Sequence, residues 1–159
     1  MRSRDTSIKT YFIRELKGAK LRRNIQSGQK RRVAEPIKSP EDIKRIRFML
    51  NDRPRDLLLF DLAVETGIGM KQILSLKAKD LSGIKKGEKI SVRSIHGQKH
   101  SVIMSDILYE SFQKFIREVK PRPDDYLFKS KKGPWSLNLS TVSNMIKEWF
   151  DAAGMKNCH

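Results

Sequence analysis

The feature that most constrains the fold is an almost wholly apolar stretch at residues 57–64, in which Asp61 is the only charged side chain. The wider segment 55–66 would carry apolar side chains around nearly the whole circumference of a helix. Because such a helix has no face suited to water, we expect it to form the centre of the core, with Gly67 ending it. The stretch is far shorter than the roughly 18 to 20 residues that cross a bilayer, so no membrane span is expected.

Patterns typical of other elements flank this segment. Pro40 is followed by two acidic residues, which predicts the start of a helix. A second, short helix is expected over residues 70–76. Alternating apolar and polar residues predict strands at 89–94 and 101–104, joined by a turn that contains Gly97. These strands are expected to form a β-hairpin.

Two further amphipathic helices are predicted towards the C-terminus. Ser105 begins the first, which ends before Pro121, and Ser140 caps the second, which Gly154 follows. A short strand or extended segment is expected between them, at residues 126–128. The whole pattern predicts the α+β class: a mostly helical domain with a small antiparallel sheet.

Positive charge is concentrated near the N-terminus. Of 159 residues, 34 are Lys or Arg and 18 are Asp or Glu, a formal net charge of +16, and residues 1–38 hold 12 of these cations against 3 acids. This excess indicates a polyanionic partner. We interpret residues 1–35 as a basic N-terminal arm and linker, with helical spacing over residues 6–20, and residues 36–159 as one folded domain. The arm is either a solvated leader or a segment that orders along DNA phosphates. Its candidate DNA-binding residues are Arg22, Arg23, Lys30, Arg31 and Arg32.

The single cysteine, Cys158, excludes an intrachain disulfide and a metal site built from several thiols. No apolar stretch of signal-peptide length follows the basic start of the chain. We therefore expect a cytoplasmic, nucleoid-associated protein that is neither secreted nor embedded in a membrane.

The segment after the predicted core helix carries a specific pattern. Residues 66–76 read TGIGMKQILSL and are followed by Asp80. They resemble the first conserved box of the tyrosine recombinases, the phage integrase family, which reads Thr-Gly-apolar-Arg-apolar-Ser/Thr-Glu-apolar-apolar-x-Leu. The resemblance continues through the hairpin, the sequence DDYLF at 124–128 and the closing AAGM at 152–155. It implies that residues 36–159 have the fold of a tyrosine-recombinase catalytic domain, truncated before the nucleophile.

The resemblance also implies a chemistry. In this family a tyrosine hydroxyl attacks a DNA phosphodiester and forms a 3′-phosphotyrosyl link, with two arginines, a lysine and histidines around the phosphate. Arginine forks suit the negative charge of the phosphorane, and a lysine or histidine can protonate the leaving 5′-oxygen. The implied partner is double-stranded DNA, with a homo-oligomer on that DNA left open. No cofactor and no metal are implied.

The chain departs from the family pattern where this chemistry resides. Gly69 occupies the position of the first arginine, and Lys71 and Gln72 replace the usual Ser/Thr and Glu. Lys71 is a poor substitute for the arginine, because two residues along a helix turn a side chain through about 200°. His159 falls roughly where the family's His-x-x-Arg box begins.

The hairpin turn offers candidate phosphate ligands. His96 stands at the family's lysine position and Lys99 lies three residues later, although both could be ordinary solvated residues. We favour Lys99, because its ammonium is always charged at neutral pH. The candidate catalytic residues are Lys99 and His159. In the folded domain the candidate DNA-binding residues are Arg93, His96, Lys99, His100, Lys129, Lys131 and Lys132.

None of the tyrosines Tyr11, Tyr109 and Tyr126 stands where the family places its nucleophile, and we interpret all three as packing residues. Trp135 and Trp149 are interpreted as core or rim aromatics rather than as platforms for stacked bases.

The sequence thus predicts a DNA-binding, integrase-like or site-specific recombinase-like protein that acts in DNA integration or recombination. We expect an enzyme only if the natural chain continues past His159 to an arginine and a tyrosine, and the chain as given to be inactive. The alternative is a non-catalytic DNA-binding remnant or regulator of a mobile element, which Gly69 favours. A ribosomal or RNA-binding structural protein would explain the charge but not the box at residues 66–76.

Overall fold

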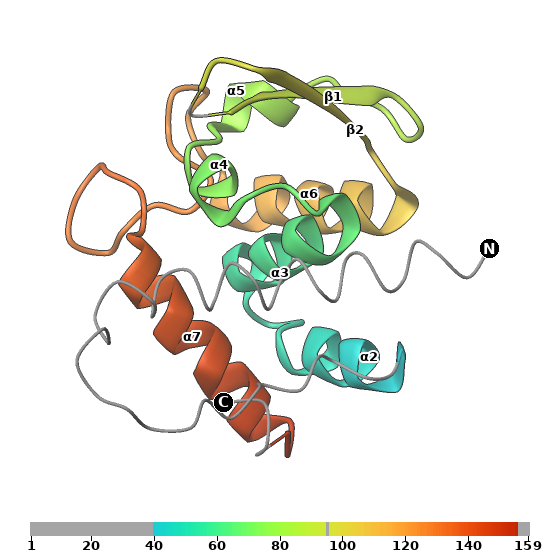
Figure 1. Cartoon of the computed structure of the whole chain (residues 1–159), viewed down its shortest axis with the longest axis vertical. Coiled ribbons are helices and arrows are strands. Elements are labelled where there is room, and N and C mark those ends of the chain that lie inside the picture. Colours follow the sequence, from blue (N-terminus) through green and yellow to red (C-terminus); the bar gives the residue numbers. More distant parts are fainter. Residues whose placement is uncertain (1–39, 95, 156–159) are drawn as a thin grey trace, which may run out of the picture.

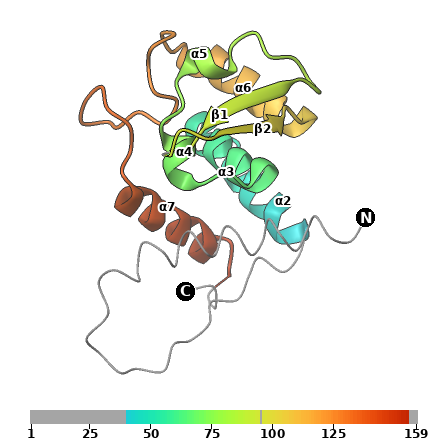
Figure 2. The same cartoon turned by 45° about the horizontal axis from the view of Figure 1, so that its top comes forward.

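The computed structural model describes residues 40–94 and 96–155. In Figure 1, helix α3 (Pro54–Thr66) runs through the middle of the molecule, with α6 (Asp106–Val119) against it and a β-hairpin on one side. Helices α2 (Pro40–Met49) and α7 (Leu139–Ala152) lie on the other side of α3, and Figure 2 shows the same separation from a second direction. The remaining elements are short helices and the two strands: α4 (Met70–Leu74), α5 (Ala78–Leu81), β1 (Lys89–Arg93) and β2 (Lys99–Ile103).

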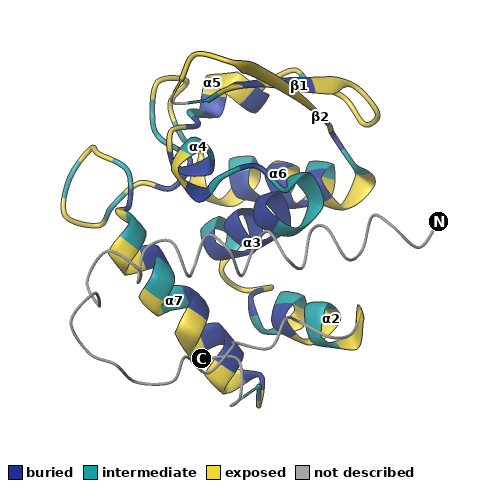
Figure 3. Cartoon of the chain, viewed as in Figure 1, coloured by how far each residue is buried: buried dark blue, intermediate teal, exposed yellow. Residues whose placement is uncertain are grey.

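Helix α3 is the centre of the core, as its apolar composition predicts. Residues 56–63 are all buried, and Figure 3 shows this helix largely in the colour of buried residues. The ring of Phe60 meets Trp149 of α7 edge-on, with ring centroids 6.4 Å apart. The helix begins at Pro54, one residue earlier than predicted, because proline suits the first helical position. Gly67 ends it in the left-handed conformation, at φ +64°.

Two partners hold Asp61, the more deeply buried of the two buried carboxylates of this helix. Asp61 is 1% exposed. Arg47 of α2 donates two hydrogen bonds to its carboxylate, at 2.8 Å and 3.3 Å, and the Ser111 hydroxyl of α6 donates a third. Burial raises the pKa of Asp61, while the hydrogen bonds from Ser111 and Arg47 act in the opposite direction. The carboxylate therefore joins α2, α3 and α6.

Strands β1 and β2 form the predicted antiparallel hairpin, with Arg93 opposite Lys99. Ile90 and Val92 are buried. This confirms the predicted fold class, a mostly helical α+β domain with a small antiparallel sheet. Strand β2 begins at Lys99 rather than at residue 101, because the backbone ladder continues through two polar residues that the alternation of apolar side chains does not mark.

Helix α4 stops at Leu74, earlier than the predicted end at residue 76. The Ser75 N–H and hydroxyl both donate to the carbonyl of Gln72, at 3.1 Å and 2.7 Å, which tightens and closes the last turn. One further turn of helix follows, α5, which the sequence pattern did not indicate. Asp80 caps it by accepting a hydrogen bond from the N–H of Lys77 at 2.8 Å.

The two later helices differ in how well their starts were predicted. Ser105 caps α6 as expected, its hydroxyl accepting the N–H of Leu108 at 3.2 Å. The prediction that Ser140 caps α7 was wrong. Asn138 is the cap, because its backbone is still extended and its side-chain oxygen accepts the N–H of Thr141 at 2.8 Å, which leaves Ser140 inside the first turn.

The segment between these helices is extended, as predicted. Tyr126 forms an isolated β-bridge with Lys77, and Lys129 forms another with Ser136. The two residues between these bridge positions are buried and anchor the segment in the core.

Several predictions concern positions outside the described residues. They are the basic arm with its helix over residues 6–20, and the roles of Cys158 and His159. Among the described residues, no helix is both long and apolar enough to cross a membrane.

Candidate nucleic-acid interface

The TGIG turn, residues 66–69, is tied to the helices on both of its sides. The Thr66 hydroxyl donates to the carbonyl of Leu62 in α3 at 2.5 Å. Gly69 is the N-cap of α4, and its N–H donates to the side-chain oxygen of Gln72 at 3.0 Å. Gln72 therefore plays the part that a glutamate plays in a capping box, so the turn keeps its geometry without the usual acid.

The backbone at Gly69 does not require a glycine. Its φ of −60° and ψ of +144° lie in the extended region, which every residue type adopts. An arginine could adopt this backbone conformation, so the backbone does not explain why a glycine stands here. The nearest cation in the helix that follows, Lys71, is exposed to solvent.

The hairpin presents two cations side by side. Arg93 of β1 and Lys99 of β2 are directly opposite in the ladder and both are exposed. Directly opposed residues share a face of the sheet, while the next pair along, Val92 and His100, belongs to the other face. Within the described residues neither Arg93 nor Lys99 has an ion-pair partner. The structure thus brings together Arg93 and Lys99 and separates His100 from them.

The turn of the hairpin is internally bonded. The Ser94 N–H donates to the carbonyl of Gln98 at 2.7 Å, and the Ser94 hydroxyl accepts the N–H groups of His96 and Gln98. Gly97 has φ +79°, a left-handed backbone conformation in which a residue with a side chain would be strained. His96 is exposed in this turn. Lys99, which the sequence analysis placed in the turn, belongs to strand β2, so its backbone is held by the ladder.

The basic loop at residues 129–133 is closed by the Lys129–Ser136 bridge and by a hydrogen bond from the Ser130 N–H to the carbonyl of Trp135 at 2.8 Å. Trp135 is 60% exposed and its ring lies over the backbone of Gly133, so it is a rim aromatic. Trp149, by contrast, is buried in the core.

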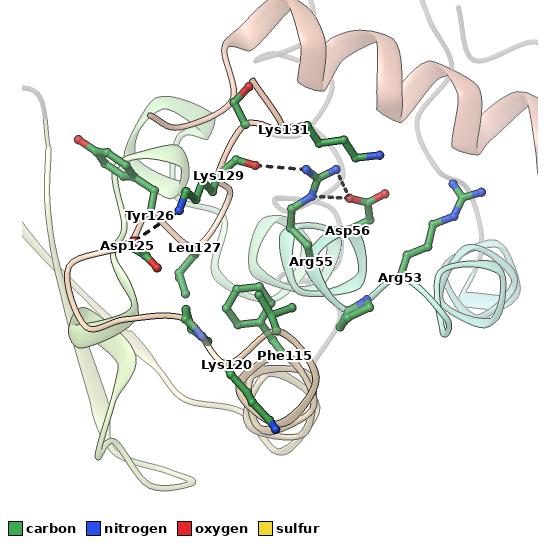
Figure 4. A pocket seen from close by; sticks show the side chains of 14 residues that line it. Arg53, Arg55, Asp56, Phe115, Lys120, Asp125, Tyr126, Leu127, Lys129 and Lys131 are labelled. Atoms are coloured by element: carbon green, nitrogen blue, oxygen red, sulfur yellow. Dashed lines mark hydrogen bonds and ion pairs between the residues drawn. The ribbon is translucent and has the colours of Figure 1, made fainter. Parts of the chain in front are cut away.

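The three lysines of this loop are not equivalent. Lys129 Nζ is 3.6 Å from a carboxylate oxygen of Asp125, and the Lys129 carbonyl accepts a hydrogen bond from Arg55 (Figure 4). Lys131 and Lys132 are exposed and have no ion-pair partner among the described residues. These two are therefore the cations of the loop that remain available for an external anion.

The carboxylates beside this loop are already engaged. The side-chain hydrogen bond from Lys79, at 2.7 Å, holds the pKa of Asp124 below its usual value. The backbone N–H of Arg122 does the same for the pKa of Asp125. Both groups are ionised at neutral pH and partly offset the positive charge around them.

Two of the tyrosines have identifiable packing partners. The Lys77 ammonium lies over the ring of Tyr126, 5.3 Å from its centroid, and that of Lys86 lies over Tyr109 at 5.5 Å. Both rings are half-buried. Tyr11 lies outside the described residues. Between residues 40 and 155, with residue 95 left out, no group of three or more His, Cys, Asp or Glu side chains is arranged to hold a metal ion.

Sequence reasoning missed three cations that the fold brings near the basic loop. Arg53 and Arg55 at the start of α3, and Lys120 after α6, line one hollow together with Lys129 and Lys131. No local pattern marks them, because they come from segments far apart in the chain. Only the packing of α3 against α6 brings them together.

Comparisons with known proteins agree with this architecture. The family model described as "Phage integrase family" matches residues 39–159. The chain is 23% identical over 125 residues to "Probable integrase/recombinase YoeC" of Bacillus subtilis, covering 78% of this chain and 67% of that protein. It is 25% identical over 128 residues to a "Tyrosine recombinase" of Pseudothermotoga lettingae, covering 80% of this chain and 43% of that protein.

A solved structure shares the fold. The crystal structure of XerA recombinase superimposes with a TM-score of 0.63 at 24% sequence identity, over 76% of this chain and 44% of that one. This chain therefore spans about two thirds of the length of the first relative and less than half of the other two.

Proposed function

Because the chain belongs to the phage integrase family, we propose that it is a DNA-binding, recombinase-like protein that acts in DNA integration or recombination. In this proposal residues 36–159 are the catalytic-domain part and residues 1–35 are a basic arm along the DNA. The single observation that carries the proposed DNA contact is the exposed pair of Arg93 and Lys99, placed opposite each other on the hairpin.

Like charges directly opposed on neighbouring strands repel and lower the stability of the hairpin. A DNA phosphate bound between Arg93 and Lys99 would replace this repulsion with two attractions. Contacts of this kind position a protein on the duplex and supply the sequence-independent part of its affinity. His96 in the adjoining turn, and Lys131 and Lys132 of the basic loop, extend the proposed surface.

The same residues define the proposed chemistry. In a chain that also carried the first arginine and a nucleophile, Lys99 and His159 would serve the reacting phosphate, Lys99 by protonating the leaving 5′-oxygen. With Gly69 in place of the first arginine, one cation that would stabilise the phosphorane is absent. We therefore propose that this polypeptide binds duplex DNA without cleaving it. We also propose that several copies assemble on one duplex and that the protein resides with chromosomal DNA.

A second function is favoured by Gly69 alone. A DNA-binding regulator or remnant of a mobile element needs the phosphate contacts but not the catalytic cation. The backbone at Gly69 would accept an arginine, so its absence fits a protein in which cleavage is no longer required. If the chain is a recombinase core, an arginine at position 69 together with a nucleophile should restore cleavage. If it is a regulator or remnant, the same changes should not restore cleavage.

The proposed interface is tested by the affinity of the chain for a labelled duplex, measured by fluorescence anisotropy. Lys99→Ala is expected to weaken binding by about tenfold, the effect of losing one charge-assisted hydrogen bond. Lys44→Ala is the matched control, because Lys44 is an exposed lysine on α2, on the far side of α3 from the hairpin, and should leave the affinity unchanged.

A second variant separates DNA binding from hairpin stability. Lys99→Glu places an acid opposite Arg93, so the melting temperature should stay the same or rise while DNA affinity falls further than in Lys99→Ala. Equal affinity of Lys99→Ala and the parent chain would contradict the proposed interface.

A further inference from the structure

An open hollow of about 820 Å³ lies at the N-terminal end of α3, bounded by the C-terminal end of α6 and the segment 125–131 (Figure 4). The box at residues 66–76 begins at the opposite end of the same helix. Because α3 has 13 residues, its two ends are about 20 Å apart. The hollow is therefore separate from the box.

The rim of the hollow, rather than its floor, is the surface that a partner would touch. The floor side chains Phe115 and Leu127 are each only 1% exposed. Figure 4 shows Arg53 and Lys131 on one side of the hollow and Lys120 on the other. All three cations are exposed, so positive charge stands on two edges of the hollow.

This surface already binds two carboxylates of its own chain. Arg55 donates a hydrogen bond to Asp56 at 3.0 Å, and Lys129 Nζ lies 3.6 Å from an oxygen of Asp125. Three further cations of the rim have no ion-pair partner among residues 40–94 and 96–155: Arg53, Lys120 and Lys131. The rim therefore retains cations for carboxylates that come from outside the chain.

The end of α6 adds two observations at this rim. Val119 is an aliphatic side chain that is 46% exposed, and it lines the hollow beside Lys120. Lys120 is the one non-glycine residue within the described part of the chain with a positive φ, at +50°, in a position that usually carries glycine. A lysine kept in a strained conformation, without an ion-pair partner, is typical of a residue with a binding role.

Shape and charge discriminate between the occupants that the rim can receive. A DNA duplex is a broad convex rod whose outer surface carries phosphates, so it neither enters a hollow nor gives Val119 an apolar contact. The basic arm and a second copy of this chain are repelled, because residues 1–38 hold 12 cations against 3 acids and the net charge is +16. An extended acidic polypeptide is narrow and carries carboxylates and aliphatic side chains on one strand.

We propose that the hollow is a docking site for an acidic segment of a partner protein, in which carboxylates flank an aliphatic side chain. Arg53 and Lys131 receive one carboxylate, Lys120 receives another, and Val119 contacts the aliphatic side chain. The site goes beyond the duplex interface proposed for the hairpin. Arg53, Val119 and Lys120 take no part in that interface, whereas Lys131 borders both surfaces and is left unchanged in the tests.

Fluorescence anisotropy of the full chain tests the site with three labelled synthetic peptides of equal length. The first alternates glutamate with leucine, the second alternates glutamate with serine, and the third alternates lysine with leucine. The glutamate–leucine peptide should bind about fivefold more tightly than the glutamate–serine peptide, because only leucine covers an exposed aliphatic side chain. The lysine–leucine peptide should not bind.

Variants assign the binding to the hollow. Arg53→Gln should lower the affinity for the glutamate–leucine peptide by about fivefold without changing the melting temperature, because the Arg53 side chain makes no capping hydrogen bond to α3. Lys120→Gly should lower this affinity similarly while the melting temperature stays the same or rises, because glycine relieves the left-handed strain. Val119→Ser should abolish the preference for leucine over serine. Lys44→Gln, the same loss of charge on α2, should change none of these values.

A labelled DNA duplex separates this site from the hairpin. Arg53→Gln and Lys120→Gly should leave the duplex affinity as it is in the parent, and Lys99→Ala should leave the peptide affinity unchanged. Unchanged peptide affinity in both Arg53→Gln and Lys120→Gly would place the peptide elsewhere on the chain and overturn the proposal. An equal loss of duplex and peptide affinity in these two variants would assign the hollow to DNA and would also overturn it.

Discussion

Asp61 shows what a single residue does to this fold. It is a charged side chain in the middle of the most apolar segment, and the sequence alone marks it as an interruption of that segment. In the structure it is the point where α2, α3 and α6 meet, through Arg47 and Ser111. A buried carboxylate of this kind depends on its partners, because an unpaired charge in the core is far more costly than a paired one.

The dependence on Arg47 predicts a pH-sensitive variant. Arg47→Met leaves the Asp61 carboxylate in the core without its cation and should lower the free energy of unfolding at pH 7 by about 2 to 3 kcal/mol. Burial raises the folded-state pKa of Asp61 above its unfolded value, and the loss of Arg47 raises it further. The folded chain then binds the proton more tightly, so the stability contributed by this group increases as the pH falls through that pKa.

Urea unfolding at pH 7 and at about pH 5 measures this effect. The deficit of Arg47→Met relative to the parent should be smaller at the lower pH, because protonation removes the uncompensated charge. Arg117→Met changes an exposed arginine on α6 and serves as the control, with little effect at either pH. A deficit that stays constant between the two pH values would contradict the assigned role of Asp61.

At the scale of whole elements, the sequence predicted those that bury a regular apolar pattern. The core helix, the hairpin and the two C-terminal helices follow from the spacing of buried side chains such as Ile90 and Val92. The exact ends did not follow, because they depend on single hydrogen bonds. Asn138 and Ser140 are both good caps, and only the backbone decides between them.

The candidate site was predicted in part for the same reason. The box at residues 66–76 is contiguous in the sequence, so its glycine in place of an arginine could be read directly. That Arg93 lies opposite Lys99 depends on the register of the two strands. The sequence does not predict this register, because β2 begins with polar residues that interrupt the alternating pattern. The hollow at Arg53 and Lys120 depends on helix packing and leaves no local trace.

The cap of α7 gives a direct test at this scale. Asn138→Ala removes the acceptor for the N–H of Thr141 and should lower the free energy of unfolding by about 1 kcal/mol. Ser140→Ala, the change at the position that the sequence favoured, should have an effect of less than about 0.5 kcal/mol. Thermal and urea unfolding of both variants decide the matter, and a larger loss for Ser140→Ala would reverse the assignment.

For the whole molecule, we expect the distribution of charge to determine the affinity for DNA more than any one contact does. The net charge of +16 is divided between the N-terminal residues and the surfaces of the described domain. Each cation that neutralises a phosphate releases a counterion, so the affinity for DNA should fall steeply with salt. The arm and the domain are expected to contribute additively to this dependence.

Deletion of residues 1–33 tests the contribution of the arm. The truncated chain should bind duplex DNA more weakly, and the slope of log K against log salt should become shallower, because fewer counterions are released. The loss should be similar for unrelated DNA sequences. The account of the arm fails if the slope of the truncated chain equals that of the full chain.

The central proposal joins these scales: this polypeptide belongs to a family of recombinases, and we propose that it binds duplex DNA without cleaving it. The most direct measurement uses nicked suicide duplexes that carry the end sequence of the chain's own genetic element, at protein concentrations that saturate binding. Denaturing electrophoresis then reveals any covalent protein–DNA product. We predict a full shift in the native gel and no covalent band, because Gly69 withholds a cation and none of Tyr11, Tyr109 and Tyr126 stands where the family places its nucleophile. A covalent band that maps to Tyr11, Tyr109 or Tyr126 would contradict the claim.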